Sequence, residues 1–246
     1  MADVVTLKIY RGDDEQGEMV EYQVPLVPGM VVLDAVHAVQ AQHAPDLAVR
    51  WNCKAGKCGS CGGEVNGKPK LMCMDRLDNY PAGEPISVRP MKTFPVMKDL
   101  ACDVSFNYRV NEKIPAFKMQ DTADKEPTFS QEEADRVQEF RKCIECFLCQ
   151  DVCHVLREHD KHESFAGPRF FVRTAGLEMH PLDTEDRIDL LKDEMGLGYC
   201  NITKCCTEVC PESITITDNA IIPLKERVVD KHYDPVKKLF RIIFNK

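Results

Sequence analysis

Four cysteines in the first third of the chain have the spacing of an iron–sulfur ligand loop. Cys53, Cys58 and Cys61 form a C-x4-C-x2-C run, and Cys73 follows further along. This is the plant-type spacing for a 2Fe–2S cluster. Glycines accompany the run at Gly56, Gly59, Gly62 and Gly63. Because glycine lets a loop wrap closely and turn its amides toward sulfur, the run predicts a 2Fe–2S cluster on these four cysteines.

A structural zinc ion is the alternative for the same four cysteines. Zinc sites prefer two C-x2-4-C knuckles. This group contains a single such pair, Cys58 and Cys61. The spacing therefore favours an iron–sulfur cluster, and a colourless chain that carries zinc would contradict it.

Two further cysteine groups match the two-cluster template of bacterial ferredoxins. The first has the spacing C-x2-C-x2-C-x3-C and consists of Cys143, Cys146, Cys149 and Cys153. The second consists of Cys200, Cys206 and Cys210, with Pro211 after it. In this template the fourth cysteine of one run serves the other cluster. The two groups therefore form an interleaved pair.

Thr203 stands where the second group should have its middle cysteine. The template then assigns a 4Fe–4S cluster to Cys143, Cys146, Cys149 and Cys210. It leaves Cys153, Cys200 and Cys206 for the other cluster, and three thiolates suit a 3Fe–4S cubane that lacks one iron. One alternative stays open, in which Cys205 supplies a fourth ligand, although it is two places from the template slot and adjacent to Cys206.

Three other side chains near these groups have no assigned role. Cys102 lies among Leu100, Ala101 and Val104, which favours a buried, inert thiol. Cys205 is the other unassigned cysteine. His154 follows a predicted ligand, and tuning a cluster, bonding a quinone and simple packing all remain open for it.

Composition limits the class of protein. The chain has 246 residues, 13 of them cysteine, and a net charge of −8. Such a charge argues against a general nucleic-acid partner, which requires a basic face. The N-terminal residues lack the basic and apolar regions of a signal peptide, and we find no apolar run long enough to span a membrane. In a reducing compartment cysteines of this kind serve as cluster ligands rather than disulfides.

The elements that must position the first group are those of a mixed α/β domain. Alternating apolar residues predict strands over 4–11 and 19–27, and a one-sided apolar pattern predicts a helix over 31–44. Asn66-Gly67 indicates a hairpin turn, and a short strand is expected over 86–88. Strand, strand, helix, cysteine loop and strands is the order of a β-grasp ferredoxin.

The second half is predicted to be helical. Ser130 and Glu133 form a capping box for a helix that runs to about residue 141. Asp183 is expected to cap a helix that ends at Gly196 and presents a solvated acidic face. Residues 235–246 carry four basic residues and no acidic one, so a basic amphipathic helix at an anionic membrane surface and a plain packed terminal helix are both open. We expect one domain over 1–103 and a second over 104–246.

The chain resembles the iron–sulfur subunits of succinate dehydrogenase and fumarate reductase. Besides the three cysteine groups, the resemblance includes ISVRPMKTFPVMKDLACD (86–103) and EFRKCIEC (139–146). It implies an α+β fold, with a β-grasp plant-type ferredoxin domain followed by a helical bacterial-type two-cluster ferredoxin domain. We find no G-x-G-x-x-G or Walker motif, and we expect no catalytic residue in this chain.

The resemblance also implies a function. The chain would be the electron-transfer subunit of a membrane-bound succinate:quinone oxidoreductase, respiratory complex II of the tricarboxylic acid cycle. Electrons would run from FAD on a flavoprotein subunit through 2Fe–2S, 4Fe–4S and 3Fe–4S clusters to a quinone at transmembrane anchor subunits. The chain would sit peripherally on the cytoplasmic face of the membrane. Fumarate reduction in the reverse direction is the alternative.

The quinone site is expected to differ from the ubiquinone type. Members of the family that reduce ubiquinone have proline after the fourth cysteine and tryptophans close behind. Here His154 follows Cys153, and Trp51, the single tryptophan, lies beside the first group. We therefore expect menaquinone to bind mainly at the anchor, where haem would also lie.

Overall fold

The chain forms two compact units in a computed structural model that describes residues 4–121 and 126–235. The first unit comprises Met1–Ser105, Ile144–Val152 and Val209–Pro211. The second comprises Phe106–Cys143, Cys153–Glu208 and Glu212–Lys246. Within the described ranges, no helix combines the length and apolar character needed to cross a membrane. The predicted basic helix of the tail lies outside the described residues, apart from its first position.

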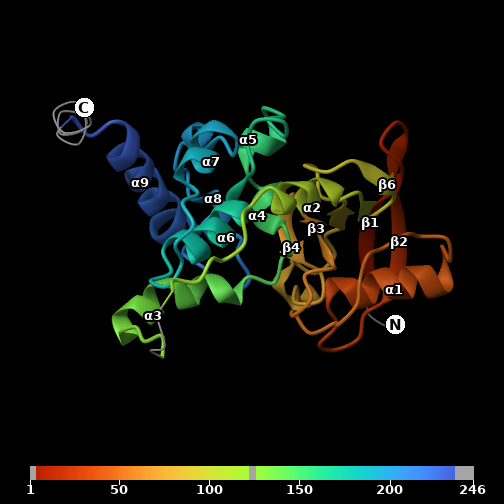
Figure 1. Cartoon of the computed structure of the whole chain (residues 1–246). Coiled ribbons are helices and arrows are strands. Elements are labelled where there is room, and N and C mark those ends of the chain that lie inside the picture. Colours follow the sequence, from red (N-terminus) through yellow and green to blue (C-terminus); the bar gives the residue numbers. More distant parts are fainter. Residues whose placement is uncertain (1–3, 122–125, 236–246) are drawn as a thin grey trace. The chain divides into compact units, whose positions relative to one another are not determined.

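A five-stranded sheet forms the body of the first unit (Figure 1). Its strands are β1 (Val4–Gly12), β2 (Gly17–Pro25), β3 (Gly62–Val65), β4 (Lys68–Leu71) and β5 (Ile86–Arg89), in the order β2-β1-β5-β3-β4. Strands β1 and β5 are parallel, and the other neighbours are antiparallel. Helix α1 (Val32–Gln42) lies across this sheet in the order expected of a β-grasp fold. The short strands β6 (Val96–Lys98) and β7 (Ala101–Cys102) pair separately.

The predicted local signals of the first unit are confirmed. Leu7 and Ile9 of β1 are fully buried, and α1 buries Val32, Val36 and Val39 on one face. The two central residues of the β3–β4 turn have positive φ, 48° at Asn66 and 74° at Gly67. Such a turn matches the twist of a hairpin.

The segment that carries Cys146 and Cys149 belongs to the first unit. Its short helix α4 (Leu148–Asp151) contacts β4. The rings of Phe94 and Phe147 meet edge to face at 6.3 Å, and the Thr93 amide donates to the Asp151 carboxylate at 3.1 Å. These contacts join residues more than fifty positions apart, so spacing alone does not predict them.

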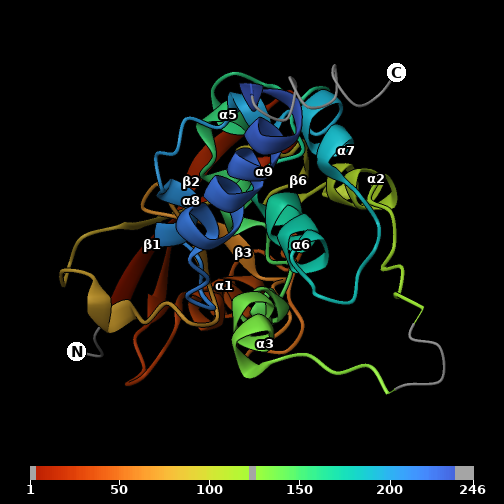
Figure 2. The ribbon, with the colours of Figure 1, turned by 60° about the vertical axis from the view of Figure 1, so that its left-hand side comes forward.

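The described part of the second unit is helical. Its elements are α2 (Ser105–Glu112, whose first residue belongs to the first unit), α3 (Gln131–Gln138), η2 (Glu139–Lys142), α5 (His154–Arg157), α6 (Pro168–Glu178), α7 (Ile188–Asp193), η3 (Leu197–Tyr199), α8 (Cys205–Glu208), the π-helix η4 (Ile216–Ile221) and α9 (Ile222–His232). Helices α6 and α9 both contact η4. Helix α7 contacts α9, and Figure 2 shows the two near one another. The capping box of Ser130 and Glu133 is confirmed at the start of α3.

Asp183 does not cap a helix, so this prediction is wrong. Helix α7 begins five residues later, at Ile188. The Asp183 carboxylate is buried, pairs with Arg187 at 3.0 Å and accepts a hydrogen bond from the Glu185 amide. The Asp183 carboxylate thus pairs with the buried Arg187 guanidinium instead of capping a helix. Gly196 does adopt the expected left-handed conformation just beyond the helix, with φ at 63°.

Candidate iron–sulfur cluster sites

The loop of the first cysteine group directs its amides at its own sulfurs. Four such bonds are formed: Ala55 and Lys57 donate to Cys53 (3.3 and 3.4 Å), Gly56 donates to Cys73 (3.3 Å), and Cys53 donates to Cys58 (3.5 Å). Lys54 and Gly56 adopt left-handed φ values of 55° and 67°, which turn the chain around the sulfurs. Amide donors of this kind stabilise anionic sulfur, so the loop fits a thiolate-ligated cluster.

Two cysteines of this loop have opposite electrostatic environments. The Cys53 amide, together with Ser60, lowers the pKa of the Cys58 thiol to about 6. Burial raises the pKa of Cys61 to about 12. A bound metal holds a coordinating thiol deprotonated, so iron would supply at Cys61 what the surrounding amides already supply at Cys58.

The loops of the first and second cysteine groups touch through their backbones. A Cβ atom on Gly59 would lie 2.7 Å from the Cα atom of Cys146 and 2.9 Å from its nitrogen. A Cβ atom on Gly62 would lie 3.3 Å from the Cys146 carbonyl oxygen. Since both glycines lack that atom, the backbones of the two loops approach more closely than a Cβ at Gly59 would allow.

Cys146 lies between two residues with left-handed backbone conformations. The φ values are 57° at Glu145 and 62° at Phe147. Helix α4 then begins at Leu148, and the carbonyl of Phe147 accepts hydrogen bonds from Gln150 and Asp151 at 3.0 Å. Of the cysteines predicted to hold the 4Fe–4S cluster, Cys146, Cys149 and Cys210 belong to the first unit, and Cys143 follows η2 in the second.

Thr203 has the same backbone setting as Cys146. The φ values at its neighbours are 61° at Ile202 and 64° at Lys204. Helix α8 then begins at Cys205, and the carbonyl of Lys204 accepts hydrogen bonds from Thr207 and Glu208. Thr203 therefore occupies the position that corresponds to Cys146. Cys206 corresponds to Cys149, and Cys205 corresponds to Leu148.

The remaining cysteines of the second unit influence one another through their charges. Burial raises the pKa of Cys153 to about 12 and that of Cys206 to about 11, and neighbouring thiols add to both effects. Cys205 is one such neighbour of both residues, and Cys200 is another neighbour of Cys206. The amides of α5 turn toward the Cys153 sulfur, as the amides of the first loop turn toward theirs. This donor set also fits an iron–sulfur cluster.

A hydrogen-bonded chain of side chains lies beside this set. The Thr203 hydroxyl is 3.1 Å from Nε2 of His154 and 3.4 Å from Sγ of Cys205. His154 thus contacts Thr203, the residue that stands in the ligand position of the template.

Comparison with known proteins gives the family. Residues 6–108 match the model of a 2Fe-2S iron-sulfur cluster binding domain, and residues 139–214 match that of a 4Fe-4S dicluster domain. The chain is 30% identical to the fumarate reductase iron-sulfur subunit of Mycobacterium tuberculosis, over 87% of this chain and 89% of the relative. It belongs to the family of succinate dehydrogenase and fumarate reductase iron–sulfur subunits.

Two further relatives show how far the likeness extends. A chain of the Mycobacterium smegmatis Sdh1 complex in the apo form shares 58% identity and a TM-score of 0.92, with 96% of this chain and 100% of that chain covered. A fumarate reductase (CoM/CoB) chain of Methanothermobacter marburgensis is 30% identical over 92% of this chain, but the present chain spans only 44% of its length.

Family membership confirms the predicted fold class, with a mixed-sheet 2Fe–2S domain ahead of a helical 4Fe–4S region. The iron–sulfur subunit is thus an electron-transferring part of an oxidoreductase. Sequence reasoning found the cysteines. It did not identify the backbone contact of Gly59 or the bond of His154 to Thr203, because both depend on how distant segments pack.

Cys102 of the iron–sulfur subunit is buried, as predicted. Burial raises the pKa of its thiol to about 12, and the thiol donates to the Met91 carbonyl at 3.5 Å. At pH 8 about one thiol in ten thousand would be ionised, and the thiolate is the reactive form. We expect iodoacetamide at pH 8 to leave Cys102 unmodified in the native protein and to alkylate it in the denatured chain. Mass spectrometry of the tryptic peptide measures this, and native alkylation would contradict it.

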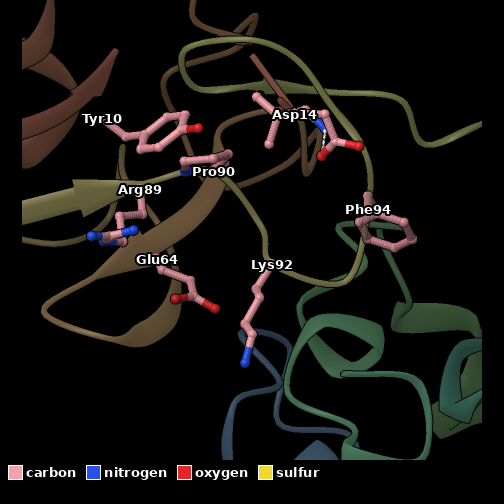
Figure 3. Close-up of a pocket in the computed structure, with 8 residues that line it drawn as sticks. Tyr10, Asp14, Glu64, Arg89, Pro90, Lys92 and Phe94 are labelled. Carbon is pink, nitrogen blue, oxygen red and sulfur yellow. Dashed lines mark hydrogen bonds between the residues drawn. The ribbon is translucent and has the colours of Figure 1, made fainter. Parts of the chain in front are cut away.

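A cavity of about 250 Å³ lies elsewhere in the first unit (Figure 3). Tyr10, Phe94 and Val96 form apolar parts of its wall, and Arg89 and Asp14 bring opposite charges. The Asp14 carboxylate accepts a hydrogen bond from the Val96 amide at 3.1 Å. Its lining includes no cysteine, so the cavity is separate from the ligand loops.

Proposed function

We propose that this iron–sulfur subunit carries electrons in a membrane-bound succinate:quinone oxidoreductase. Electrons enter from FAD on a flavoprotein subunit and pass through 2Fe–2S, 4Fe–4S and 3Fe–4S clusters toward a quinone. The observation that carries the proposal is the backbone contact between Gly59 and Cys146. Two ligand loops in direct contact favour electron transfer from the first cluster to the second.

The proposed ligands follow the three cysteine groups. The 2Fe–2S cluster is held by Cys53, Cys58, Cys61 and Cys73, and the 4Fe–4S cluster by Cys143, Cys146, Cys149 and Cys210. The 3Fe–4S cluster is held by Cys153, Cys200 and Cys206. Support for three irons comes from Thr203, which lies in the position of Cys146 and offers a hydroxyl in place of a thiolate. We propose domains over 1–103 and 104–246; the matched 2Fe-2S range, 6–108, ends within five residues of this boundary.

The flavoprotein is proposed to dock where the first cluster lies nearest the surface. Cys53 is exposed, and Trp51 beside it and Met74 after Cys73 have 47% and 59% of their surfaces exposed. Lys54 lies over the Trp51 ring at 5.1 Å. An exposed tryptophan and an exposed methionine are typical of protein interfaces, where aromatic residues and methionine are enriched.

The anchor side is proposed to hold the quinone. His154 is engaged by Thr203, and Arg157 pairs with Glu158 at 3.3 Å. These contacts support the expectation that menaquinone binds mainly at transmembrane anchor subunits, which would also hold haem. The chain would then lie peripherally on the cytoplasmic face of the membrane. Fumarate reduction is the second candidate, because relatives named fumarate reductase match nearly the whole chain.

Co-purification from native membranes tests this function. We expect a flavoprotein with bound FAD and a haem-bearing anchor to accompany the chain, with succinate-dependent quinone reduction. Faster fumarate reduction than succinate oxidation would favour the second candidate. A colourless preparation without iron would overturn both.

We expect Thr203→Cys to convert the three-iron cluster into a four-iron one. The substitution places a thiolate in the position that Cys146 has in the other run. Electron paramagnetic resonance (EPR) of the air-oxidised protein measures the three-iron signal. It should fall at least fivefold, because an added iron–thiolate bond is worth more than the roughly 1 kcal/mol, or about fivefold, of a single hydrogen bond. Thr203→Ser serves as the control and should keep the signal. If the parent protein shows no three-iron signal, the three-iron assignment is contradicted and Cys205 is favoured as a fourth ligand.

A further inference from the structure

The two runs of the second and third cysteine groups differ at two linked positions. Thr203 takes the place of a thiolate, and His154 follows the distant ligand Cys153, where Pro211 follows the distant ligand Cys210 of the other run. The imidazole of His154 reaches the Thr203 hydroxyl at 3.1 Å. His154, which stands in the proline position, thus contacts Thr203, which stands in the cysteine position.

Cys205 lies in the same loop and is not one of the proposed cluster ligands. It lies near Cys153 and Cys206, which belong to the same proposed ligand set, and its Sγ is 3.4 Å from the Thr203 hydroxyl. It is partly exposed, whereas Leu148, its counterpart in the other run, is 1% exposed. A fourth thiol is therefore next to the position that the three-iron cluster leaves open.

We propose that His154 is a positioning residue that holds Thr203 in the open ligand position and thereby keeps Cys205 from becoming a fourth ligand. The inference rests on the three-iron site proposed above. The hydroxyl of Thr203 links the imidazole on one side to the thiol on the other, so its loss releases the thiol. Ile202 and Lys204 hold the loop in left-handed conformations that few side chains adopt freely, so a lost bond allows the loop to relax.

The expected consequence is a change in iron number. Cys205 would supply the fourth iron–thiolate bond and lose its thiol proton to solvent. The change would also need one electron from dithionite for the three-iron core and one added ferrous ion, with no further electron transfer. In the parent protein His154 and Thr203 oppose this step.

The experiment uses the purified complex, reduced anaerobically with dithionite, incubated with ferrous ion and then reoxidised. EPR measures the three-iron signal, and Mössbauer spectroscopy measures the iron number. We expect the three-iron signal of His154→Ala to be roughly fivefold weaker than that of the parent, which is the change expected from one lost hydrogen bond. Thr203→Val, which keeps the side-chain shape and removes the hydroxyl, should lose it as well. His154→Gln, whose amide can still bond Thr203, should keep it.

Two controls make the result specific. His159→Ala removes an exposed histidine five residues away and should behave as the parent. The double variant His154→Ala with Cys205→Ser should keep the three-iron signal, because no fourth thiol remains. Retention of the signal in both His154→Ala and Thr203→Val would overturn the proposal, as would its loss in the double variant. A parent complex without any three-iron signal would instead contradict the proposed cluster assignment.

Discussion

Gly59→Ala should lower the melting temperature of the chain by about 10 °C and reduce its cluster content. The new Cβ would lie 2.7 Å from Cα of Cys146 and 2.9 Å from the carbonyl oxygen of Ile144. These are backbone atoms, so no side chain can swing aside. The φ of 69° at Gly59 adds strain for any residue with a Cβ. Together the two effects should cost about 3 kcal/mol or more, and about 3 kcal/mol corresponds to roughly 10 °C in a chain of this size.

Gly67→Ala is the matched control for this experiment. Gly67 has a similar φ of 74°, but a Cβ there would meet no atom within 4 Å. It should cost about 1 kcal/mol, from backbone strain alone. Thermal unfolding and iron per chain measure both variants. Equal effects would show that the contact between the two ligand loops contributes nothing to stability or cluster content. That result would weaken the proposed route from the first cluster to the second.

Arg187→Met should destabilise the second unit by about 3–5 kcal/mol, because removing one partner of a buried ion pair leaves an uncompensated charge. The Arg187 side chain is fully buried and pairs with Asp183 at 3.0 Å and with Glu178 at 3.8 Å. Its guanidinium also donates to the carbonyls of Pro115 (3.0 Å) and Ala116 (2.7 Å). Methionine fills a similar volume but makes none of these bonds.

The pH dependence of this variant has a definite sign. Burial already raises the pKa of Glu178, and the variant removes one of the nearby cations that oppose the rise. A carboxyl group whose folded pKa exceeds its unfolded value loses stability as pH rises between the two. The penalty of Arg187→Met should therefore shrink as the pH is lowered toward about 4, the ordinary value for a carboxyl group.

Arg76→Met provides the control for Arg187→Met. Arg76 pairs with Asp78, and both side chains are more than half exposed. Exposed pairs contribute less than about 1 kcal/mol, and we expect little change. Denaturant unfolding of both variants at pH 7 and pH 5 measures the difference. A penalty for Arg187→Met that equals the control or grows at low pH would contradict the role assigned to this ion pair.

Local sequence sufficed for features that depend on neighbours in the chain. The strands β1 and β2, helix α1, the Asn66-Gly67 turn and the Ser130 capping box all lie where spacing and residue type predict them. Each is stabilised by contacts within a few residues or by one buried face. The prediction at Asp183 is wrong because Arg187 is held by carbonyls some seventy residues earlier, which no local pattern records.

The sequence by itself determined the three cysteine groups and the substitution of Thr203 for a cysteine, because cluster chemistry requires those residue types at those spacings. Only the tertiary structure decided that the segment 144–152 packs in the first unit, that Gly59 contacts Cys146, and that His154 binds Thr203. The physical reason is the distance along the chain over which each feature depends on other residues. Ligand identity depends on residue type and local spacing, whereas the approach of two loops depends on burial and close packing between segments far apart in the chain.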